Sequence, residues 1–251
     1  MSVYHRTQGF VLKKTDLREA DQIFVVYAED FGRVEVLGKG MRKIKSKIRS
    51  GIDVFYLSEI DFVQGKKQKT LIGATIIDKF INIRSSPEKL DIAHKIAVAI
   101  DSLIVEQEKD KQIWDLLKEV FEKLNNSEFT SFIDDATKGQ VIYYYFLWNL
   151  LSALGYKSDL YHCASCGNKL LPEKNCFIPK GGILCCECVG DGQGLGSEDS
   201  EEIHQDIIKI LRILENRGWE TLAKLKTQKT HLQGLRKFFQ IISVSIIRPT
   251  G

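Results

Sequence analysis

The stretch GFVLKKTDLREADQIFVVYAEDFGRVEVLGKG, residues 9–40, decides the fold of the N-terminal part of the chain. It contains three segments rich in Val, Ile, Phe and Tyr, separated by short charged or Gly-containing stretches such as TDLREA and EDFG. Segments of this length and composition, separated in this way, are typical of β-strands. The stretch therefore predicts a series of short strands.

Two further segments, DVFYLSEIDFV at 53–63 and TLIGATIIDKF at 70–80, continue this pattern. Five short strands within about eighty residues favour a small barrel or a sandwich. In the first of these segments the two-residue period of a strand places one set of apolar side chains on a single face. This set is Val54, Tyr56, Ile60 and Phe62.

The apolar period changes to that of a helix after Ser86. Ser86 suits the N-cap of a helix, and Pro87 suits its first position because that N–H has no helical partner. Apolar stripes at helical spacing then recur to the end of the chain. The expected helices cover residues 87–108, 110–126, 131–155, 201–218 and 231–247. The fold class is thus α+β, with a strand domain at 1–82, a helical domain at 83–251 and a cysteine-rich insert at about 160–190.

The composition is that of an ordinary globular protein. With 251 residues, 43% of them apolar and 27% charged, the chain can bury a hydrophobic core and is too apolar for disorder. It holds no run of eighteen apolar residues, and its first residues lack the apolar region of a secretion signal. We therefore expect a cytoplasmic protein without a membrane partner.

The net charge of +3 is unevenly distributed along the chain. Residues 1–80 carry 15 Lys and Arg against 10 Asp and Glu, a balance of +5, whereas residues 81–251 carry 21 against 23, a balance of −2. This asymmetry suggests a polyanionic partner for the N-terminal part.

Much of this positive charge lies in the segment GKGMRKIKSKIRSG, residues 38–51, which has no acidic residue. Charge runs are usually solvated loops, but this one joins two strands of a predicted small barrel and is bracketed by glycines. Small barrels bind nucleic acids with strand faces and connecting loops, and Lys and Arg contact phosphates without reading sequence. The candidate DNA-binding residues are Lys39, Arg42, Lys43, Lys45, Lys47 and Arg49.

The strongest motif is a pair of C-x-x-C knuckles, Cys163 with Cys166 and Cys185 with Cys188, separated by eighteen residues. This spacing matches four-thiolate zinc sites. Four thiolates complete a tetrahedron and leave no coordination position for water or substrate. We therefore predict one structural Zn²⁺ ion, which would contribute roughly 10–16 kcal/mol to folding.

Two alternatives remain for these cysteines: four reduced structural thiols, or two redox-active pairs. A thioredoxin-like pair would need a βαβ setting, which the predicted elements do not provide. Cys176 and Cys186 are left over, and we expect them to be packed or exposed without a function.

No catalytic constellation emerges from the sequence. The histidines are scattered, and there is no metalloprotease motif, P-loop, dinucleotide-binding motif or nucleophile elbow. The aromatic run from Tyr143 to Phe146, with Trp148, cannot form one flat stacking surface, because consecutive helical residues point about 100° apart. We expect a buried central helix there, part of which can line a groove for a partner peptide.

Several motifs together resemble the RecO family of bacterial recombination mediators. The chain carries R-E-A-D at Arg18–Asp21, F-G-R at Phe31–Arg33 and K-G-M-R-K-I-K-S at Lys39–Ser46. Before and between the cysteine knuckles it carries L-G-Y at Leu154–Tyr156 and F-I-P-K-G-G at Phe177–Gly182. The resemblance covers nearly the whole chain. It departs from the family pattern at Ala20, where Thr is common, in a position that we expect to serve the geometry of the turn.

The resemblance implies an OB-fold at the N-terminus and a helical domain with an inserted zinc finger. It also implies a non-enzymatic DNA repair and recombination protein that binds single- and double-stranded DNA and anneals complementary strands. Its implied partners are RecR, with which it loads RecA onto DNA covered by the single-stranded DNA-binding protein SSB, and the C-terminal tail of SSB, held on the helical domain. The implied location is the bacterial cytoplasm, in association with the nucleoid.

Two other classes of function compete with this one. A zinc-containing protein-interaction adaptor would use the basic segment only for solubility and would show no salt-sensitive affinity for DNA. A metal-dependent nuclease or RNA-modifying enzyme is disfavoured because the sequence offers neither an open metal site nor clustered carboxylates.

Overall fold

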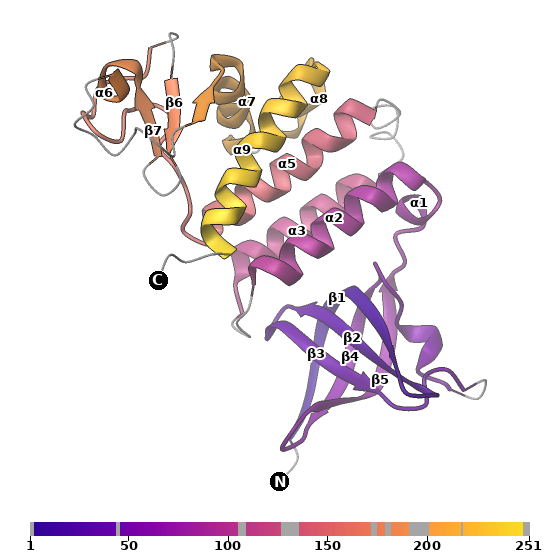
Figure 1. The fold of residues 1–251 in the computed structure, drawn as a ribbon. Helices are drawn as coiled ribbons and strands as arrows, with labels where there is room; N and C mark the ends of the chain where they lie inside the picture. The colour runs from indigo at the N-terminus through magenta and orange to yellow at the C-terminus, as the bar shows by residue number, and fades with distance from the viewer. Residues whose placement is uncertain are drawn as a thin grey trace. The chain divides into compact units, whose positions relative to one another are not determined.

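The computed structural model describes residues 3–43, 46–104, 109–126, 136–171, 175–178, 182–190, 201–216 and 218–247 (Figure 1). The chain divides into two compact units, Met1–Asp134 and Asp135–Gly251. Five strands come first and most of the helices follow, so the α+β class predicted from the sequence is confirmed. The predicted division into a strand domain at 1–82 and a helical domain at 83–251 stays a prediction about folding domains.

The first unit begins with five strands: β1 (Val3–Leu17), β2 (Asp21–Ala28), β3 (Gly32–Gly38), β4 (Leu57–Gln64) and β5 (Lys69–Asp78). They form a sheet of order β1-β2-β3-β5-β4, which closes because β4 also pairs with β1. All pairings are antiparallel except that of β3 with β5, which is parallel. All five strands were predicted, with β2 at its predicted bounds.

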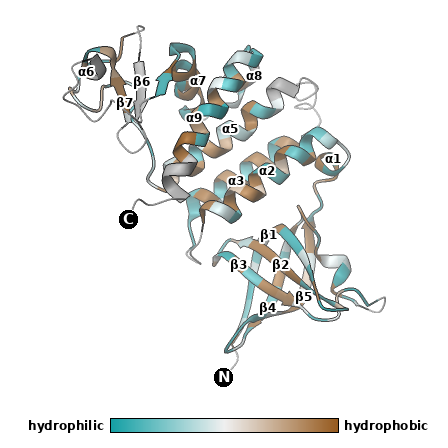
Figure 2. Ribbon diagram, in the orientation of Figure 1, coloured by the Kyte–Doolittle hydropathy of each residue, from teal (hydrophilic) through white to brown (hydrophobic). Residues whose placement is uncertain are grey.

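The interior of this barrel is a single apolar cluster, because alternate side chains of each strand point inward. In Figure 2 much of β2 has the brown colour of apolar residues. The buried members of the cluster are Val11, Phe24, Val26, Ala28, Val34, Val36, Met41, Ile52, Ile60, Phe62 and Leu71. Met41 and Ile52 come from the segment between β3 and β4, so that segment takes part in the core of the barrel.

The single strand face predicted for DVFYLSEIDFV is correct for Ile60 and Phe62 and wrong for Val54 and Tyr56. Ile60 and Phe62 lie in β4 and are fully buried. Val54 and Tyr56 precede the strand, in a turn where the Tyr56 N–H donates to the Asp53 carbonyl oxygen at 3.0 Å. The backbone therefore turns before Leu57, and the two-residue period begins only there.

Three helices complete the described part of the first unit: α1 (Ile81–Arg84), α2 (Pro87–Leu103) and α3 (Lys111–Asn125). Ser86 caps α2 as predicted, since its hydroxyl oxygen accepts the Lys89 N–H. Helix α3 packs on the outside of the barrel through aromatic rings. The Phe10 ring of β1 lies 5.1 Å from that of Phe121 and 5.2 Å from that of Trp114, both on α3.

In the second unit the long helices are α5 (Ala136–Ala153), α7 (Gln205–Glu215) and α9 (Lys229–Ile247), with the short α8 (Trp219–Lys224) between the last two. Tyr145, Phe146 and Trp148 of α5 are fully buried, which confirms the predicted buried helix. Asn149 links α5 to α7 by donating from Nδ2 to the carbonyl oxygen of Leu214 at 3.2 Å. In the described chain no helix is both long and apolar enough to cross a membrane.

A small sheet of order β7-β6-β8 carries the cysteine-rich region, with a short helix α6 after β7. Its elements are β6 (Asn175–Ile178), β7 (Gly182–Cys185), α6 (Cys186–Gly190) and β8 (Glu201–Ile203). The predicted helix 201–218 is wrong in its first three residues, because Glu201–Ile203 pair with β6 as a strand. The glycine-rich stretch GDGQGLGSEDS at residues 190–200, expected from the sequence to be a flexible connection, lies outside the described residues from Asp191 onward.

Candidate metal centre and nucleic-acid interface

The four cysteines of the two knuckles come together at one point. Cys163 and Cys166 lie in the loop before β6, Cys185 ends β7, and Cys188 lies in α6. Their sulfur atoms are all within 4.8 Å of one another, and the Cys166 and Cys185 sulfurs are 3.8 Å apart. Four thiolates around Zn²⁺ at about 2.3 Å stand roughly 3.8 Å apart at the corners of a tetrahedron. The quartet therefore has the size of a four-thiolate site.

Backbone hydrogen bonds shape the first knuckle around Cys163. Its N–H donates to the Asn168 carbonyl oxygen at 2.8 Å, and its carbonyl oxygen accepts the Gly167 N–H at 2.9 Å. Gly167 adopts a positive φ of 72°, which a residue without Cβ takes at little cost. The Ala164 N–H donates to the Ile183 carbonyl oxygen of β7, which joins the first knuckle to the strand that ends in Cys185.

The thiols of the quartet influence one another strongly. Burial alone would raise the pKa of Cys163, but backbone N–H groups, including that of Cys185, lower it to about 6. The neighbouring thiols of Cys185 and Cys166 raise the pKa of Cys188 to about 12. The four cysteines therefore do not lose their protons equally easily. A divalent cation removes this difference because it binds each cysteine as a thiolate. The four sulfurs are therefore suited to a thiophilic metal ion whose coordination positions they fill completely.

The residues beside the quartet take other roles. The His162 Nδ1 lies 3.0 Å from Asp159 Oδ2, so this ring pairs with a carboxylate. The Cys186 side chain is exposed, as expected for a residue outside the quartet. Cys176 lies in β6, and its side chain is outside the described residues.

The basic segment is anchored to the barrel by apolar residues within it and directly after it. Met41 is 1% exposed and Ile52, the residue that follows the segment, is 3% exposed; both belong to the barrel core, against which Ile48 also packs. These anchors were not predicted from the sequence, where the segment looked like a charged loop. The signal was present, because Met41 and Ile48 interrupt the cations with apolar side chains and Ile52 directly follows the segment.

Hydrogen bonds and a close contact fix both ends of the segment. At its beginning, the Gly40 N–H donates to Asp21 Oδ1 at 2.8 Å, and the Arg42 N–H donates to the Ala20 carbonyl oxygen. At its end, Gly51 packs so tightly on β5 that an added Cβ would lie 1.9 Å from the Ala74 carbonyl oxygen. The described ends of the segment are therefore held at the β1–β2 turn and on β5.

The cations of the segment face solvent. Lys39, Arg42, Lys43, Lys47 and Arg49 are all exposed. Arg42 pairs with Asp16 at 3.5 Å, whereas the other four make no ion pair within the described chain. Lys45, the sixth predicted residue, lies outside the described residues. The structure thus presents several unneutralised cations on one connected stretch of the barrel.

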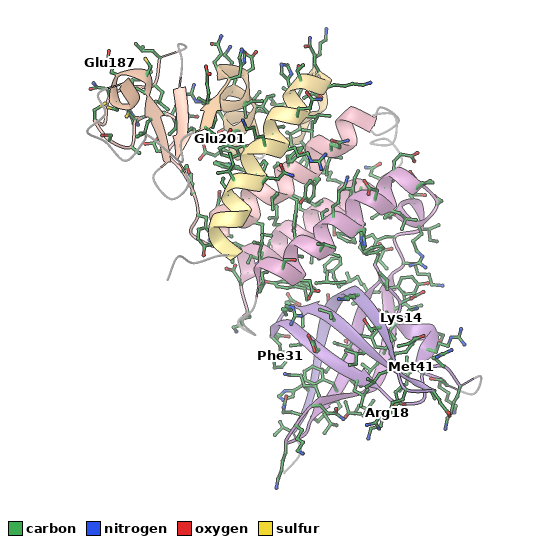
Figure 3. All side chains as sticks on the ribbon, viewed as in Figure 1. Lys14, Arg18, Phe31, Met41, Glu187 and Glu201 are labelled. Atoms are coloured by element: carbon green, nitrogen blue, oxygen red, sulfur yellow. The ribbon has the colours of Figure 1, made fainter. Side chains whose placement is uncertain are left out.

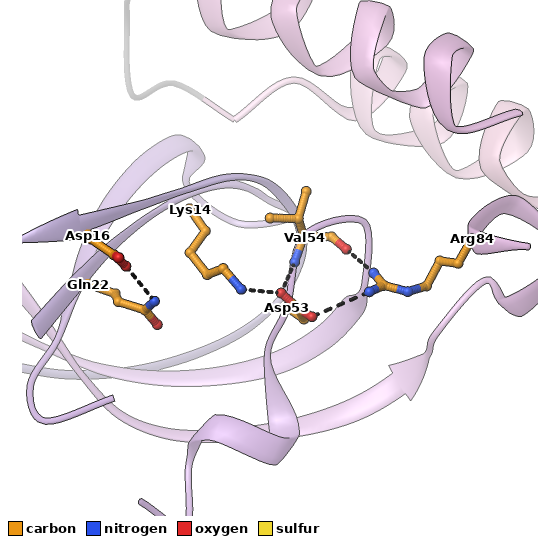
Figure 4. Close-up of polar contacts among 6 residues, drawn as sticks. All are labelled: Lys14, Asp16, Gln22, Asp53, Val54 and Arg84. Carbon is orange, nitrogen blue, oxygen red and sulfur yellow. Dashed lines mark hydrogen bonds and ion pairs between the residues drawn. The ribbon is translucent and has the colours of Figure 1, made fainter. Parts of the chain in front are cut away.

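Other cations lie at the same end of the barrel and were not predicted. Figure 3 shows Lys14 and Arg18 at the end that also holds Met41, whereas Phe31 lies at the opposite end. Lys14 Nζ pairs with Asp53 Oδ1 at 2.7 Å, and Asp53 also binds Arg84 and the Val54 N–H (Figure 4). These residues were not predicted because β1 and the turn after it are distant from the basic segment in sequence.

The second unit contains a pocket of about 470 Å³ between β8, α7 and α9. Its lining includes the apolar Ile207, Phe238 and Ile241 and the ionisable Glu201, Glu202, His204, Asp206, His231 and Lys237. The pocket brings together two histidines that looked scattered in sequence. His204 Nδ1 is 3.3 Å and His231 Nε2 is 3.9 Å from Asp206 Oδ2.

Comparison with known proteins gives a consistent result over nearly the whole chain. The family model "Recombination protein O N terminal" matches residues 1–80, and "Recombination protein O C terminal" matches residues 84–242. The two matches meet near the end of the five-stranded barrel.

Similar curated proteins carry one shared description. The chain is 30% identical over 231 residues to a "DNA repair protein RecO" of Dehalococcoides mccartyi strain 195, covering 92% of this chain and 85% of the relative. It is 29% identical over 245 residues to the protein of that name from Desulforamulus reducens, covering 95% and 89%. With the one from Roseiflexus sp. it is 28% identical over 224 residues, covering 88% and 74%.

Proposed function

Because this chain belongs to the RecO family of DNA repair proteins, we propose that it is a non-enzymatic recombination mediator that binds DNA with its N-terminal barrel. The observation that carries this proposal is that apolar residues hold the basic segment on the barrel while its cations face solvent. Met41 and, directly after the segment, Ile52 are buried in the barrel core and Ile48 packs against it, while Lys39, Lys43, Lys47 and Arg49 are exposed without carboxylate partners in the described chain. A loop that only kept the protein soluble would need no such anchoring.

We assign the barrel to the OB-fold. The strand order β1-β2-β3-β5-β4, the return pairing of β4 with β1 and the parallel contact of β3 with β5 support this assignment. OB-folds bind oligonucleotides on one strand face and with the adjoining loops. The basic segment connects β3 to β4 and is hydrogen-bonded to the β1–β2 turn, so its cations extend the surface of that turn.

The cations are suited to phosphates rather than to bases. Lys and Arg that contact the backbone give affinity without sequence preference, which fits a protein acting on many DNA sequences. The same contacts serve single- and double-stranded DNA, and two neutralised strands approach each other more easily. We therefore include strand annealing in the proposed function, together with RecR-assisted loading of RecA onto DNA covered by SSB.

The cysteine quartet is proposed to hold one structural Zn²⁺ through Cys163, Cys166, Cys185 and Cys188. Its four sulfurs support this because they match the size of a closed tetrahedral site. A bound ion would hold the first knuckle to β7 and α6 and would leave no position for substrate. The helical part of the chain is proposed to hold the C-terminal tail of SSB.

A fluorescence anisotropy titration with a labelled single-stranded oligonucleotide at two salt concentrations tests the proposal. We expect affinity that falls steeply as salt rises, because cations on the protein release counterions from DNA. A matched double-stranded oligonucleotide should show the same trend. If neither oligonucleotide binds at low salt, the DNA-binding role is wrong, and the protein-interaction adaptor becomes the better account.

A further inference from the structure

A pocket of about 250 Å³ opens at the end of the barrel beside the basic segment. Its volume admits a phosphate group together with part of a sugar. Its lining is polar and mostly cationic over an apolar floor. The lining residues are Lys14, Gln22, Met41, Arg42, Arg49, Ile52 and Asp53.

The register of β1 and β2 explains why polar side chains reach this place. Lys14 lies opposite Phe24 in the ladder, and Gln22 lies opposite Asp16. Directly opposed residues point to the same side of a sheet, and Phe24 points into the barrel core. An irregularity between Val11 and Lys13 shifts the alternation so that Lys14 shares this inner side. Lys14 and Gln22 therefore continue the inward-facing rows to the open end of the barrel.

The floor of the pocket is closed. Met41 and Ile52 are almost completely buried and belong to the barrel core. A group that enters the pocket therefore reaches an end and cannot pass through the barrel. Barrel mouths of this kind are common ligand sites.

The walls carry three cations and one carboxylate. Lys14 and Asp53 are about one-third exposed, at 34% and 33% of their side chains, and pair at 2.7 Å. Asp53 is also bound by Arg84 from outside the pocket, so its charge is shared (Figure 4). Arg42 pairs at 3.5 Å with Asp16, which does not line the pocket, and Arg49 has no ion-pair partner in the described chain. The lining therefore has a net positive charge that an anion can neutralise.

We propose that the mouth of the barrel binds the terminal phosphate of a DNA strand. The inference rests on the proposed DNA-binding function and adds a preference for strand ends. A phosphate monoester carries nearly two negative charges at neutral pH, whereas an internal diester carries one. A closed pocket accepts a chain end more readily than a strand that must continue in both directions. Internal phosphates meet Lys39, Lys43 and Lys47, which do not line the pocket.

The test uses three labelled oligonucleotides of one sequence, with a 5′-phosphate, a 3′-phosphate or hydroxyl groups at both ends. Anisotropy titrations with the full chain at fixed ionic strength measure their affinities. We expect one phosphorylated form to bind roughly tenfold more tightly than the hydroxyl form, since charge-assisted hydrogen bonds are strong. The two phosphorylated arms show which end is recognised. Replacing part of the chloride by inorganic phosphate should reduce the difference in affinity between the phosphorylated and the hydroxyl oligonucleotides.

Two variants locate the effect in the pocket, and one serves as control. Lys14→Gln and Arg49→Gln should each reduce the preference for the phosphorylated end. Lys39→Gln should weaken all three oligonucleotides and keep their ratio. Arg49→Gln still tests the proposal if Lys14→Gln fails to fold, because the Arg49 side chain is exposed.

The outcomes separate this inference from the function on which it rests. Salt-sensitive binding with equal affinity for all three oligonucleotides would overturn the end preference and leave the DNA-binding role intact. A preference that persists unchanged in both pocket variants would also overturn it. If none of the three oligonucleotides binds, the proposed function fails and this inference fails with it.

Discussion

Arg33 of β3 and Asp101 of α2 join the barrel to the helix that packs on it. Arg33 donates from Nε at 2.9 Å and from Nη2 at 2.6 Å to the same oxygen, Asp101 Oδ1. Their side chains are only 18% and 24% exposed. The pair therefore ties residues far apart in sequence within the first compact unit.

Loss of this pair should destabilise the first unit. We expect Asp101→Asn to lower the free energy of unfolding by about 1–2 kcal/mol, because a partly buried guanidinium loses its charged acceptor. The measurement is urea unfolding followed by circular dichroism. Asp115→Asn is the control: its pair with Lys111 is exposed and spans four helical residues, so about 0.3–0.5 kcal/mol is expected. Equal effects in the two variants would contradict the structural role of Arg33 and Asp101.

The local elements could be predicted from sequence because their signals are local. Strand β2 has the composition of a strand between turns, and Ser86 with Pro87 marks the start of α2. The pairing of Glu201–Ile203 with β6 could not be predicted, because it depends on a partner distant in the chain. A strand of three residues also has too few side chains to show a period.

The candidate sites differ in how much the sequence reveals. The cysteine spacing identified all four residues that come together, since a metal site of this class has a fixed pattern. The cations of the basic segment were also visible, but Lys14 was not recognised as their neighbour. Its position depends on the irregularity between Val11 and Lys13, which reverses the expected alternation. A sequence pattern does not show where such a shift occurs.

Met41 should hold the basic segment on the barrel. Met41→Ala is expected to cost about 2–5 kcal/mol in stability, because it leaves a cavity in the core. It should also speed trypsin cleavage within residues 42–49 under native conditions. Met41→Leu keeps the volume and should cost less than about 1.5 kcal/mol, with trypsin cleavage close to that of the unmodified protein. Unchanged cleavage in Met41→Ala would show that the segment does not depend on this anchor.

The adjacent Cys185 and Cys186 allow a matched test of the metal site. Cys185→Ser should abolish stoichiometric zinc and lower the melting temperature, whereas the exposed Cys186→Ser should retain one ion per chain. Elemental analysis of the purified variants gives the zinc content, and thermal unfolding gives the stability. Loss of zinc in Cys186→Ser, with retention in Cys185→Ser, would reverse the ligand assignment.

Asp53 should contribute a stability that depends on pH. Burial alone would raise its pKa, but bonds from Lys14, the Val54 N–H and Arg84 prevail and hold the pKa below its usual value. A carboxyl with a lowered folded-state pKa stabilises the protein above its unfolded pKa of about 3.9, and the contribution is lost as pH falls through the folded value. Asp53→Asn should therefore be less stable at pH 7, and the difference should shrink below about pH 4. Urea unfolding at pH 7, 5 and 3.5 measures it, and a difference that grows on acidification would contradict this account.

The salt dependence of DNA binding tests the central claim most directly. If all six basic residues contact phosphates of single-stranded DNA, a plot of log affinity against log salt has a slope of roughly −4. Replacing Lys39, Arg42, Lys43 and Arg49 together by Gln should weaken binding and flatten that slope by roughly 3. The charge-matched control replaces four exposed lysines elsewhere by Gln: Lys118, Lys224, Lys226 and Lys229. A flattened slope in the first variant alone is the predicted result, and an unchanged slope in that variant would contradict the assignment of DNA binding to the basic segment.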